Sequence, residues 1–580
     1  MGKKTSYDGP KYWGLSGAPL SRMIGIAAGA GFLLFGYDQG VMSGLLTLPS
    51  FTEIFPEIDT TKNAEAEAGT STESTLQGLT IGLYEIGCLI GALSCLWLGD
   101  LWGRRAIIWI GTVWMIVGAI IQTSSYSLAQ LIIGRVIGGV GNGMHTATIP
   151  MWQSECSPPN KRGMLVMVEG LLITGGICMA YWIDFAFYWL DPSSRFAENE
   201  YQLEDFPHRS AAWRVPVAWQ ILLCIPTFIT IWMPESPRWL VLRGRKEEAR
   251  KVIASLDELQ IDDPEVDAKI EEIQGSIELA GETKLRDLLR QGKEKNFHRA
   301  TLGFIIQMFQ QISGINLITY YAATLYETNL GFSPLVSRIV AACNGTEYFL
   351  ASFIAVWTIE RFGRRNLMLF GAAGMSATMA ILAGCTSPAA LNPDPQTQEA
   401  RNEAPAYVAA VFLFVFNTFF AIGWLGMTWL YPAEITPLSI RAAANGISTS
   451  SNWIFNFLVV LITPVAFATI QYRTYIIFAV LNLAILISTY FIFPETAGRS
   501  LEEMSFIFEK ASIYNPYDVV RIEKRTPRRY DKQGRLLNSP AGLEDGNYDD
   551  ANNGSNQEKS RADRLETHSA STPSVDEVQR

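Results

Sequence analysis

The sequence is short of charge and almost free of histidine. Only 18% of its 580 residues are Asp, Glu, Lys or Arg, it has 4 histidines, and 48% of it is hydrophobic. Soluble globular proteins carry about a quarter charged residues, so a chain this long and this apolar is not an ordinary soluble multidomain protein. The composition indicates a protein embedded in a lipid bilayer, and the formal net charge of −10 gives no reason to expect a nucleic-acid partner.

Cysteine is also scarce, and no two of the 7 cysteines form a Cys-x-x-Cys pair. Six of them lie in or beside apolar runs: Cys88, Cys95, Cys178, Cys224, Cys343 and Cys385. Such cysteines pack as small apolar side chains, so we expect no metal site and no disulfide chemistry. The chain also lacks the Gly-x-x-x-x-Gly-Lys-Ser/Thr loop that binds nucleotide phosphates, which argues against ATP-driven pumping, and we expect no cofactor.

Long hydrophobic runs are what the sequence has in abundance. A helix that spans about 30 Å of hydrocarbon needs roughly 20 residues. Runs without any charged residue cover 106–134, 215–234, 300–326, 366–393, 442–472 and 474–494. Glycine-rich runs with isolated charges cover 22–48, 76–98, 128–150, 163–185, 336–359 and 404–432. The sequence therefore predicts an all-α membrane protein with about twelve transmembrane helices, six in each half.

One set of polar residues occurs twice, in the same order, between these runs. Gly103-Arg104-Arg105 recurs as Gly363-Arg364-Arg365, Glu155 and Arg162 recur as Glu434 and Arg441, and Pro234-Glu235-Ser236 recurs as Pro494-Glu495-Thr496. Parallel repeats in a membrane protein are typical of secondary transporters. We therefore predict a transporter and not an enzyme.

Basic residues indicate the orientation in the membrane. Short cytoplasmic loops carry an excess of Lys and Arg, and here such residues flank alternate loops: Arg104, Arg105, Lys161, Arg162, Arg238, Arg364, Arg365 and Arg441. We expect these loops and both termini to be cytoplasmic, and the acidic loop that holds Glu53, Glu57 and Asp59 to lie outside. The first apolar segment keeps Asp38 inside it, so we expect a signal anchor and no cleaved signal peptide.

The same pattern divides the chain into five segments. We expect a cytoplasmic N-terminal segment (1–21), a six-helix half (22–234), a cytoplasmic helical linker (235–299), a second six-helix half (300–494) and a cytoplasmic tail (495–580). The linker is either a passive tether or a latch that helps to close the inner gate. From about residue 514 the tail has few apolar residues, and we expect most of it to be disordered because burial cannot offset its ordering entropy.

Carboxylates inside the apolar runs are candidates for proton coupling, because an ion-driven cycle needs an intramembrane group that changes charge. They are Asp38, Glu85, Glu169, Asp184 and Glu347. Arg135 is the obvious cation, and an Asp38 to Arg135 ion pair would break when the carboxylate takes up a proton. The alternative is a permanent structural salt bridge. His145 is expected to be a packed or hydrogen-bonded histidine.

Amide side chains are candidates for substrate binding. The run from Gln310 to Asn316 places amides along one helix, where paired donors and acceptors suit the neighbouring hydroxyls of a sugar or polyol. Tyr320 and Tyr321 follow in the same run, and Asn344, Asn452, Asn456 and a stacking Trp429 could line the same cavity. The alternative is hydrogen bonding between helices, which is common in membranes.

Taken together these motifs resemble the sugar porter family of the major facilitator superfamily over nearly all of residues 22–508. The residues that carry the resemblance are Gly36-Tyr37-Asp38, Gly103-Arg104-Arg105, Gly134-Arg135, the run 234–240 (PESPRWL), the run 310–316 (QQISGIN) and the run 494–503 (PETAGRSLEE). The resemblance implies the major facilitator fold, with two six-helix halves and a cytoplasmic helical linker.

The resemblance also implies roles for individual residues. Positions that contact sugar in the family are held here by Gln310, Gln311, Asn316, Asn344, Trp429 and Asn452. Asp38 and Arg135 match the pair implicated in proton coupling. The charge network that closes the cytoplasmic side is matched by Arg104, Glu155, Arg162, Glu235, Arg364, Glu434, Arg441 and Glu495.

Further runs are similar to a fungal branch that includes proton-coupled glycerol symporters and proton-coupled sugar symporters. They are 36–40 (GYDQG), Trp152 to Glu155, Glu169-Gly170 and 181–185 (YWIDF). Many sugar porters carry a sugar-binding glutamine where this chain has Gly170. Loss of that amide removes a hydrogen bond to a hydroxyl and puts selectivity for hexose in doubt.

We therefore expect a plasma-membrane carrier that takes up a neutral monosaccharide or small polyol with a proton by alternating access. Two alternatives remain open: a proton-independent uniporter of the same fold, and a non-transporting nutrient sensor. A uniporter differs from a symporter in that its uptake does not depend on a proton gradient. A sensor differs from both because it transports no solute in a transporter-deficient host.

Overall fold

A computed structural model describes residues 7, 9–60, 71–157, 162–191, 210–280, 288–289, 291–391, 403–437, 439–499, 501–512 and 515–527. Apart from an isolated bridge between Tyr12 and Leu15, the regular structure of these residues is helical. The all-α expectation is thus confirmed.

The N-terminal half consists of six membrane-length passes. They are α1 (Gly17–Leu45), α3 (Ser71–Trp102), α4 (Arg104–Thr123), α5 (Leu128–Glu155), α6 (Arg162–Tyr188) and α8 (Ala211–Cys224), which the 3₁₀ helix η5 (Pro226–Trp232) extends. The short helices α2 (Pro49–Thr52) and η1 (Pro56–Ile58) lie between α1 and α3. Gly103, with φ of 90°, ends α3 and lets α4 begin at the next residue.

The C-terminal half repeats this order. Its helices are α13 (Asn296–Ile312), α14 (Ile315–Thr324) with the π-helix η6 (Leu325–Asn329), α15 (Pro334–Phe362), α16 (Arg364–Cys385), α17 (Pro388–Leu391), α18 (Glu403–Phe420) with the π-helix η7 (Ala421–Leu425), α19 (Met427–Ile435), α20 (Arg441–Ile470) and α21 (Arg473–Ile492). Gly363, with φ of 86°, separates α15 from α16 as Gly103 separates α3 from α4.

Within the described residues, 10 helices are long and apolar enough to cross a membrane by length and composition. The two remaining passes are α5, which carries Arg135, Asn142 and His145, and the pair α13 and α14. The prediction of one unbroken helix over 300–326 is wrong, because Gly314 adopts a φ of 97° and interrupts it. A side chain at this glycine would also meet Phe478, since an added Cβ would lie 2.8 Å from the ring.

Glycines allow the helices of the N-terminal half to approach backbone to backbone. A Cβ added at Gly143 of α5 would lie 2.0 Å from the carbonyl oxygen of Cys88 in α3, and one at Gly36 of α1 would lie 1.9 Å from the carbonyl oxygen of Ile173 in α6. Small residues at such crossings let transmembrane helices pack closely. The glycine-rich runs of the sequence are therefore packing surfaces.

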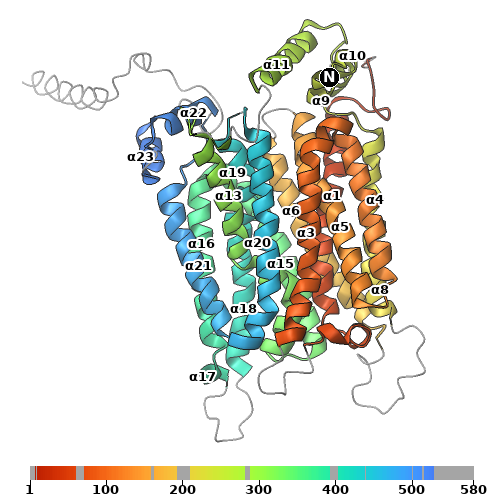
Figure 1. The fold of residues 1–580 in the computed structure, drawn as a ribbon, viewed down its shortest axis with the longest axis vertical. Coiled ribbons are helices and arrows are strands. Elements are labelled where there is room, and N and C mark those ends of the chain that lie inside the picture. The colour runs from red at the N-terminus through yellow and green to blue at the C-terminus, as the bar shows by residue number, and fades with distance from the viewer. Residues whose placement is uncertain are drawn as a thin grey trace, which may run out of the picture. The chain divides into compact units, whose positions relative to one another are not determined.

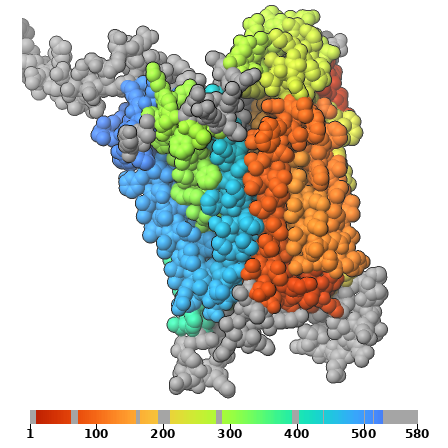
Figure 2. All heavy atoms as spheres, viewed as in Figure 1, coloured from red at the N-terminus to blue at the C-terminus, as the bar shows by residue number. Residues whose placement is uncertain are grey.

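The two halves lie side by side (Figure 1). They meet where α3 packs against α20, α6 against α15, and α1 against α14. Figure 2 shows the N-terminal helices in red and orange next to the C-terminal helices in green and blue. Each of these contacts joins one helix of the first half to one helix of the second.

The linker forms α9 (Pro237–Leu242), α10 (Lys246–Asp257) and α11 (Pro264–Ala280) at the end where α1 begins. We call this end the linker end and the opposite end the far end. α9 to α11 share a small apolar core that includes Trp239, Leu240, Val252 and Val266. The N-terminal segment packs on it, because the hydroxyl of Tyr7 donates to the carbonyl of Ala254 at 2.9 Å.

Two helices follow α21, namely α22 (Leu501–Lys510) and α23 (Tyr517–Arg525). α23 lies in the segment that we expected to be disordered. It forms because Val519 and Val520 are buried and because Glu523 pairs with Arg499 at 2.8 Å, with both side chains buried. The rest of the expected tail, 528–580, lies outside the described residues.

Candidate functional site

A chain of buried amides surrounds the break between α13 and α14. Asn452 of α20 donates from Nδ2 to Gln307 Oε1 at 2.7 Å and to Gln310 Oε1 at 3.0 Å. Gln311 Nε2 donates to Gln310 Oε1 at 3.3 Å. Asn316 lies beyond the break, and its Nδ2 donates to Asn456 Oδ1 at 2.6 Å and also to Gln311. The predicted residues Gln310, Gln311, Asn316 and Asn452 thus form one hydrogen-bonded group.

Gln310 has no hydrogen-bonding capacity left. Its Nε2 donates to the carbonyls of Trp424 and Leu425, both at 3.1 Å, while its Oε1 accepts from Asn452 and Gln311. The two carbonyls are free for this side chain because they lie at the π-helix η7, where the regular α-helical bonding pattern is broken. Gln310 therefore holds α13, α20 and η7 together.

Two other amides of the region are only partly satisfied. Asn344 of α15 accepts from Asn417 Nδ2 at 2.8 Å, but its own Nδ2 has no partner among the described residues. The same holds for Nδ2 of Asn456. Both side chains are at most 1% exposed, and a buried amide without a partner costs about 1 to 3 kcal/mol. These two nitrogens have both of their hydrogens available for a further acceptor.

Trp429 and Tyr320 take different positions. Trp429 is half-buried on α19, and no hydrogen bond in the described residues joins it to the amide chain. Tyr320 is fully buried on α14, and its hydroxyl donates to Glu85 of α3. It therefore bonds across the two halves.

The sequence analysis missed Gln307 and Asn417. Gln307 precedes Gln310 by three residues, so the two share a helix face, and this spacing could have identified it. Asn417 stands alone in an apolar run, and only the fold brings it to Asn344.

Asp38 and Arg135 are both buried, at 1% and 0% exposure, but no ion pair joins them in this structure. Arg135 Nη2 donates to the carbonyl of Ile81 at 3.3 Å, and its guanidinium lies 4.9 Å from the ring centroid of Tyr84. Both oxygens of Asp38, and Nε and Nη1 of Arg135, lack a hydrogen bond of standard geometry within the described residues. The expected direct salt bridge is replaced by a longer-range interaction beside Tyr84.

His145 is held by hydrogen bonds, as expected. Its Nε2 lies 2.8 Å from the carbonyl of Ile108 and 3.0 Å from the hydroxyl of Thr112.

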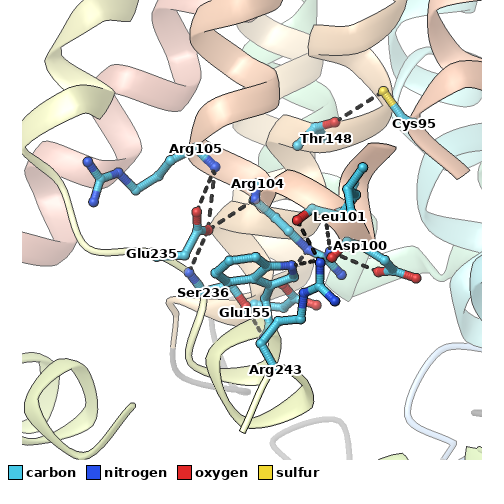
Figure 3. Close-up of polar contacts among 12 residues, drawn as sticks. Cys95, Asp100, Leu101, Arg104, Arg105, Thr148, Glu155, Glu235, Ser236 and Arg243 are labelled. Atoms are coloured by element: carbon cyan, nitrogen blue, oxygen red, sulfur yellow. Dashed lines mark hydrogen bonds and ion pairs between the residues drawn. The ribbon is translucent and has the colours of Figure 1, made fainter. Parts of the chain in front are cut away.

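At the linker end of the first half, Glu235 caps α4 (Figure 3). Its oxygens accept from the backbone amides of Arg104 at 3.1 Å and Arg105 at 3.2 Å. Arg104 extends from there to Glu155 at 3.3 Å and to Asp100 at 3.2 Å. The carboxylate at a helix N-terminus is favoured by the helix dipole. Burial raises the pKa of Glu235, and the amides of Ser236 and Arg105 oppose that rise.

The second half repeats this arrangement. Glu495 accepts from the backbone amides of Arg364 at 2.8 Å and Arg365 at 3.1 Å. Arg364 pairs with Glu434 at 2.9 Å, as Arg104 pairs with Glu155. The six predicted residues Arg104, Glu155, Glu235, Arg364, Glu434 and Glu495 thus form one charge cluster in each half.

The last two residues of the predicted network are less informative. Arg441 donates to the carbonyl of Thr436 at 3.0 Å. The side chain of Arg162 lies outside the described residues. The proposed role of the whole set as a gate stays a prediction.

Gly170 of α6 faces the second half. A Cβ added there would lie 3.5 Å from Leu425 and 3.9 Å from Gly426, so a longer side chain at this position would enter the interface beside η7. Its neighbour Glu169 is buried at 4% exposure. Gly170 therefore borders the region of the amide chain, because the carbonyl of Leu425 accepts from Gln310.

Comparison with known proteins identifies the family to which this chain is related. The family model described as "Sugar (and other) transporter" matches residues 23–508. The sugar transporter STL1 of Saccharomyces cerevisiae is 37% identical over 509 residues, which are 86% of this chain and 83% of that protein. The MFS-type transporter oryC of Aspergillus oryzae is 36% identical over 529 residues, 90% of this chain and 91% of that protein.

The fold has a counterpart among solved structures. The structure of XylE, a major facilitator superfamily protein bound to 6-bromo-6-deoxy-D-glucose, aligns with a TM-score of 0.67 at 24% identity and covers 84% of this chain and 99% of that one. These findings establish the fold and the class of protein, a transporter and not an enzyme. The chain therefore belongs to the sugar transporter family of the major facilitator superfamily.

Proposed function

We propose that this transporter takes up a small neutral polyhydroxylated solute, a monosaccharide or a small polyol, together with a proton. The observation that carries the proposal is the chain of buried amides from Gln307 to Asn456. Amides present donors and acceptors without a net charge, which matches hydroxyl groups and disfavours charged solutes. STL1, whose name is that of a sugar transporter, is the relative that supports this choice of solute.

The site is built from parts that can move relative to one another. Gln307, Gln310 and Gln311 belong to α13, Asn316 to α14, and Asn452 and Asn456 to α20. Gly314 separates α13 from α14, and interrupted helices at the middle of the membrane are typical of transporter substrate sites. A solute bound to these amides would therefore contact both sides of the break.

Hydrogen bonds between the halves hold the far end closed. The amide of Ala323 donates to Ser43 at 3.3 Å, Arg338 donates to Thr47 at 3.0 Å, and the hydroxyl of Tyr181 donates to the carbonyl of Thr319 at 2.5 Å. Alternating access requires that these bonds break when the site opens toward the far end.

Proton coupling rests on Asp38 and Arg135. A carboxylate and a guanidinium buried together without a direct pair are costly, so uptake of a proton by Asp38 relieves part of that cost. In the proposed cycle the protonated carrier binds solute from outside, the halves close over it, and the clusters of Arg104 and Arg364 separate as the linker end opens. Release of the proton inside restores the interaction of Asp38 with Arg135.

We further propose that the linker end is cytoplasmic and that the protein resides in the plasma membrane. The linker end carries Arg104, Arg105, Arg243 and Arg364, whereas the far end carries Glu57 and Asp59. This distribution follows the excess of basic residues on the cytoplasmic side, and it supports our proposal that both termini are cytoplasmic.

The test is uptake of labelled glucose, xylose and glycerol by yeast cells without transporters of their own that express this chain, with and without a protonophore. Accumulation of one solute that the protonophore abolishes supports the proposal. Equilibration that the protonophore leaves unchanged identifies a uniporter, and no uptake of any solute by surface-expressed protein contradicts transport of this class.

A further inference from the structure

One carboxyl group bridges the two halves at the centre of the protein. Glu85 of α3 is 0% exposed, and its Oε1 accepts the hydroxyl of Tyr320 from α14. Tyr320 follows Asn316 by one helical turn, and Asn456 of the amide chain also acts on Glu85. Glu85 therefore lies next to the proposed substrate site, although neither the coupling pair nor the amide chain includes it.

The carboxyl group is only half satisfied. Its second oxygen, Oε2, has no hydrogen-bond partner among the described residues. Arg135, the only arginine of α5, is bonded to the carbonyl of Ile81, one turn before Glu85 on the same helix. Its charge acts on both Glu85 and Asp38.

This leaves two carboxyl groups and one cation in a buried site. With both carboxyls ionised the group of three carries a net negative charge, and like charges in a medium of low dielectric disfavour that state. One bound proton would make this group of three neutral.

The groups that face Glu85 from each neighbouring element are few. α1 contributes Asp38, α5 contributes Arg135, and α14 contributes Tyr320, while α3 itself adds Cys88. α20 contributes the neutral amide of Asn456. Arg135 is the one cation in this set of described residues.

We propose that Glu85 is a second proton-binding group of the transporter and that its bond to Tyr320 links the bound proton to the contact between the halves. An ionised carboxylate accepts a hydrogen bond about twice as strong as a neutral acceptor does. When Glu85 is ionised, Tyr320 holds α14 against α3. When Glu85 takes up a proton, its bond to Tyr320 weakens and the charge of Arg135 acts mainly on Asp38. The two halves then separate more readily at the far end. This inference rests on the proposed proton-coupled transport.

Two variants test the inference, because they are expected to shift the pH dependence of transport in opposite directions. Glu85→Gln keeps an acceptor for Tyr320 but binds no proton and removes a negative charge. Tyr320→Phe keeps Glu85 but removes the donor that stabilises its ionised form. Tyr475→Phe is the matched control for Tyr320→Phe, because Tyr475 is also a buried tyrosine but lies in α21 and packs against Phe467 within the second half.

The measurement is the rate of exchange of labelled for unlabelled glucose, xylose or glycerol in proteoliposomes at saturating concentration, from pH 4 to pH 9. The midpoint of the pH dependence is expected to move by about one pH unit or more toward acid in Glu85→Gln, because the site holds its proton less strongly. It is expected to move toward alkaline pH in Tyr320→Phe and to stay unchanged in Tyr475→Phe.

Midpoints of Glu85→Gln and Tyr320→Phe that both equal the wild type would overturn the inference, as would shifts in the same direction. If Glu85→Gln does not reach the membrane, Tyr320→Phe decides alone, because its alkaline shift requires a titrating Glu85. Failure of the proposed function is a different result: the wild type itself would show exchange and uptake independent of protons.

Discussion

Asn452 of α20 donates a 3.0 Å hydrogen bond to Gln310 of α13. Through this bond α20 is joined to η7, because the other end of the Gln310 amide holds the carbonyls of Trp424 and Leu425. One glutamine therefore sets the relative positions of three elements around the proposed substrate site. Its role is to position its neighbours, because all of its own hydrogen bonds are made within the protein.

Gln310→Ala is expected to raise the KM for transport at least tenfold. The change leaves Asn452 and two backbone carbonyls without their partner, and each buried group of this kind costs about 1 to 3 kcal/mol, where 1.4 kcal/mol is a factor of ten. The measurement is the concentration dependence of initial uptake. Gln122→Ala is the control, since Gln122 is equally buried but bonds to Gly134 within the first half; an unchanged KM in Gln310→Ala removes Gln310 from the site.

Asp38→Asn is expected to abolish accumulation of solute against a gradient while exchange persists. Asparagine has nearly the same shape as aspartate but cannot bind and release a proton, so the carrier remains in the state equivalent to protonated. Uptake under an imposed pH gradient and exchange of preloaded solute are measured on the same cells. Accumulation that survives in the variant shows that Asp38 has no part in coupling.

Gly103→Ala is expected to lower stability by about 1 to 3 kcal/mol. Gly103 adopts φ 90° and ψ 168°, a region that costs other residues about this much, and the added Cβ would lie 2.6 Å from Glu235 Oε2. Thermal unfolding of the purified protein measures the change. Gly99→Ala, one helical turn earlier with open space around its Cβ, should unfold at the wild-type temperature or above; equal unfolding temperatures for both variants contradict the capping geometry.

Gly36→Ala is expected to reduce the amount of folded protein at the cell surface. Its Cβ would overlap the carbonyl oxygen of Ile173, and overpacking of this kind costs about 1 to 3 kcal/mol. Surface labelling and the unfolding temperature of the purified variant provide the measurement. Gly25→Ala in the same helix has its nearest neighbour at 3.8 Å and serves as the tolerated control. Wild-type surface levels in Gly36→Ala would mean that α1 and α6 are not in this close contact.

The sequence predicted the helical passes well and the breaks within them poorly. Apolar length is a property of the chain alone, so passes such as α16 and α21 were found directly. The interruption at Gly314 depends on Phe478, which lies far away in the sequence and leaves no space for a side chain there. The helix α23 likewise depends on the pairing of Glu523 with Arg499.

The candidate site shows the same division. Gln310, Gln311 and Asn316 share a short segment, so their pattern was visible. The saturation of Gln310 by Asn452 and by the carbonyls of η7 was not visible, because it requires α13, α20 and η7 to meet. The absence of a direct ion pair between Asp38 and Arg135 also could not be foreseen, since it depends on the place that Tyr84 takes beside the guanidinium.

The carboxylate caps on α4 and α16 determine which parts of the two halves can bend. Glu235 bonds to the first residue of α4, and Glu495 bonds to the first residue of α16. Each glutamate lies in the segment that follows the last pass of its half, so the bond joins that segment to the helix. Arg105 and Arg365 strengthen the same connection, because they donate to the carbonyls of Thr230 and Phe493. These bonds make the linker end of each half rigid. Relative motion of the two halves therefore has to occur at the contacts between them, such as the packing of α3 against α20.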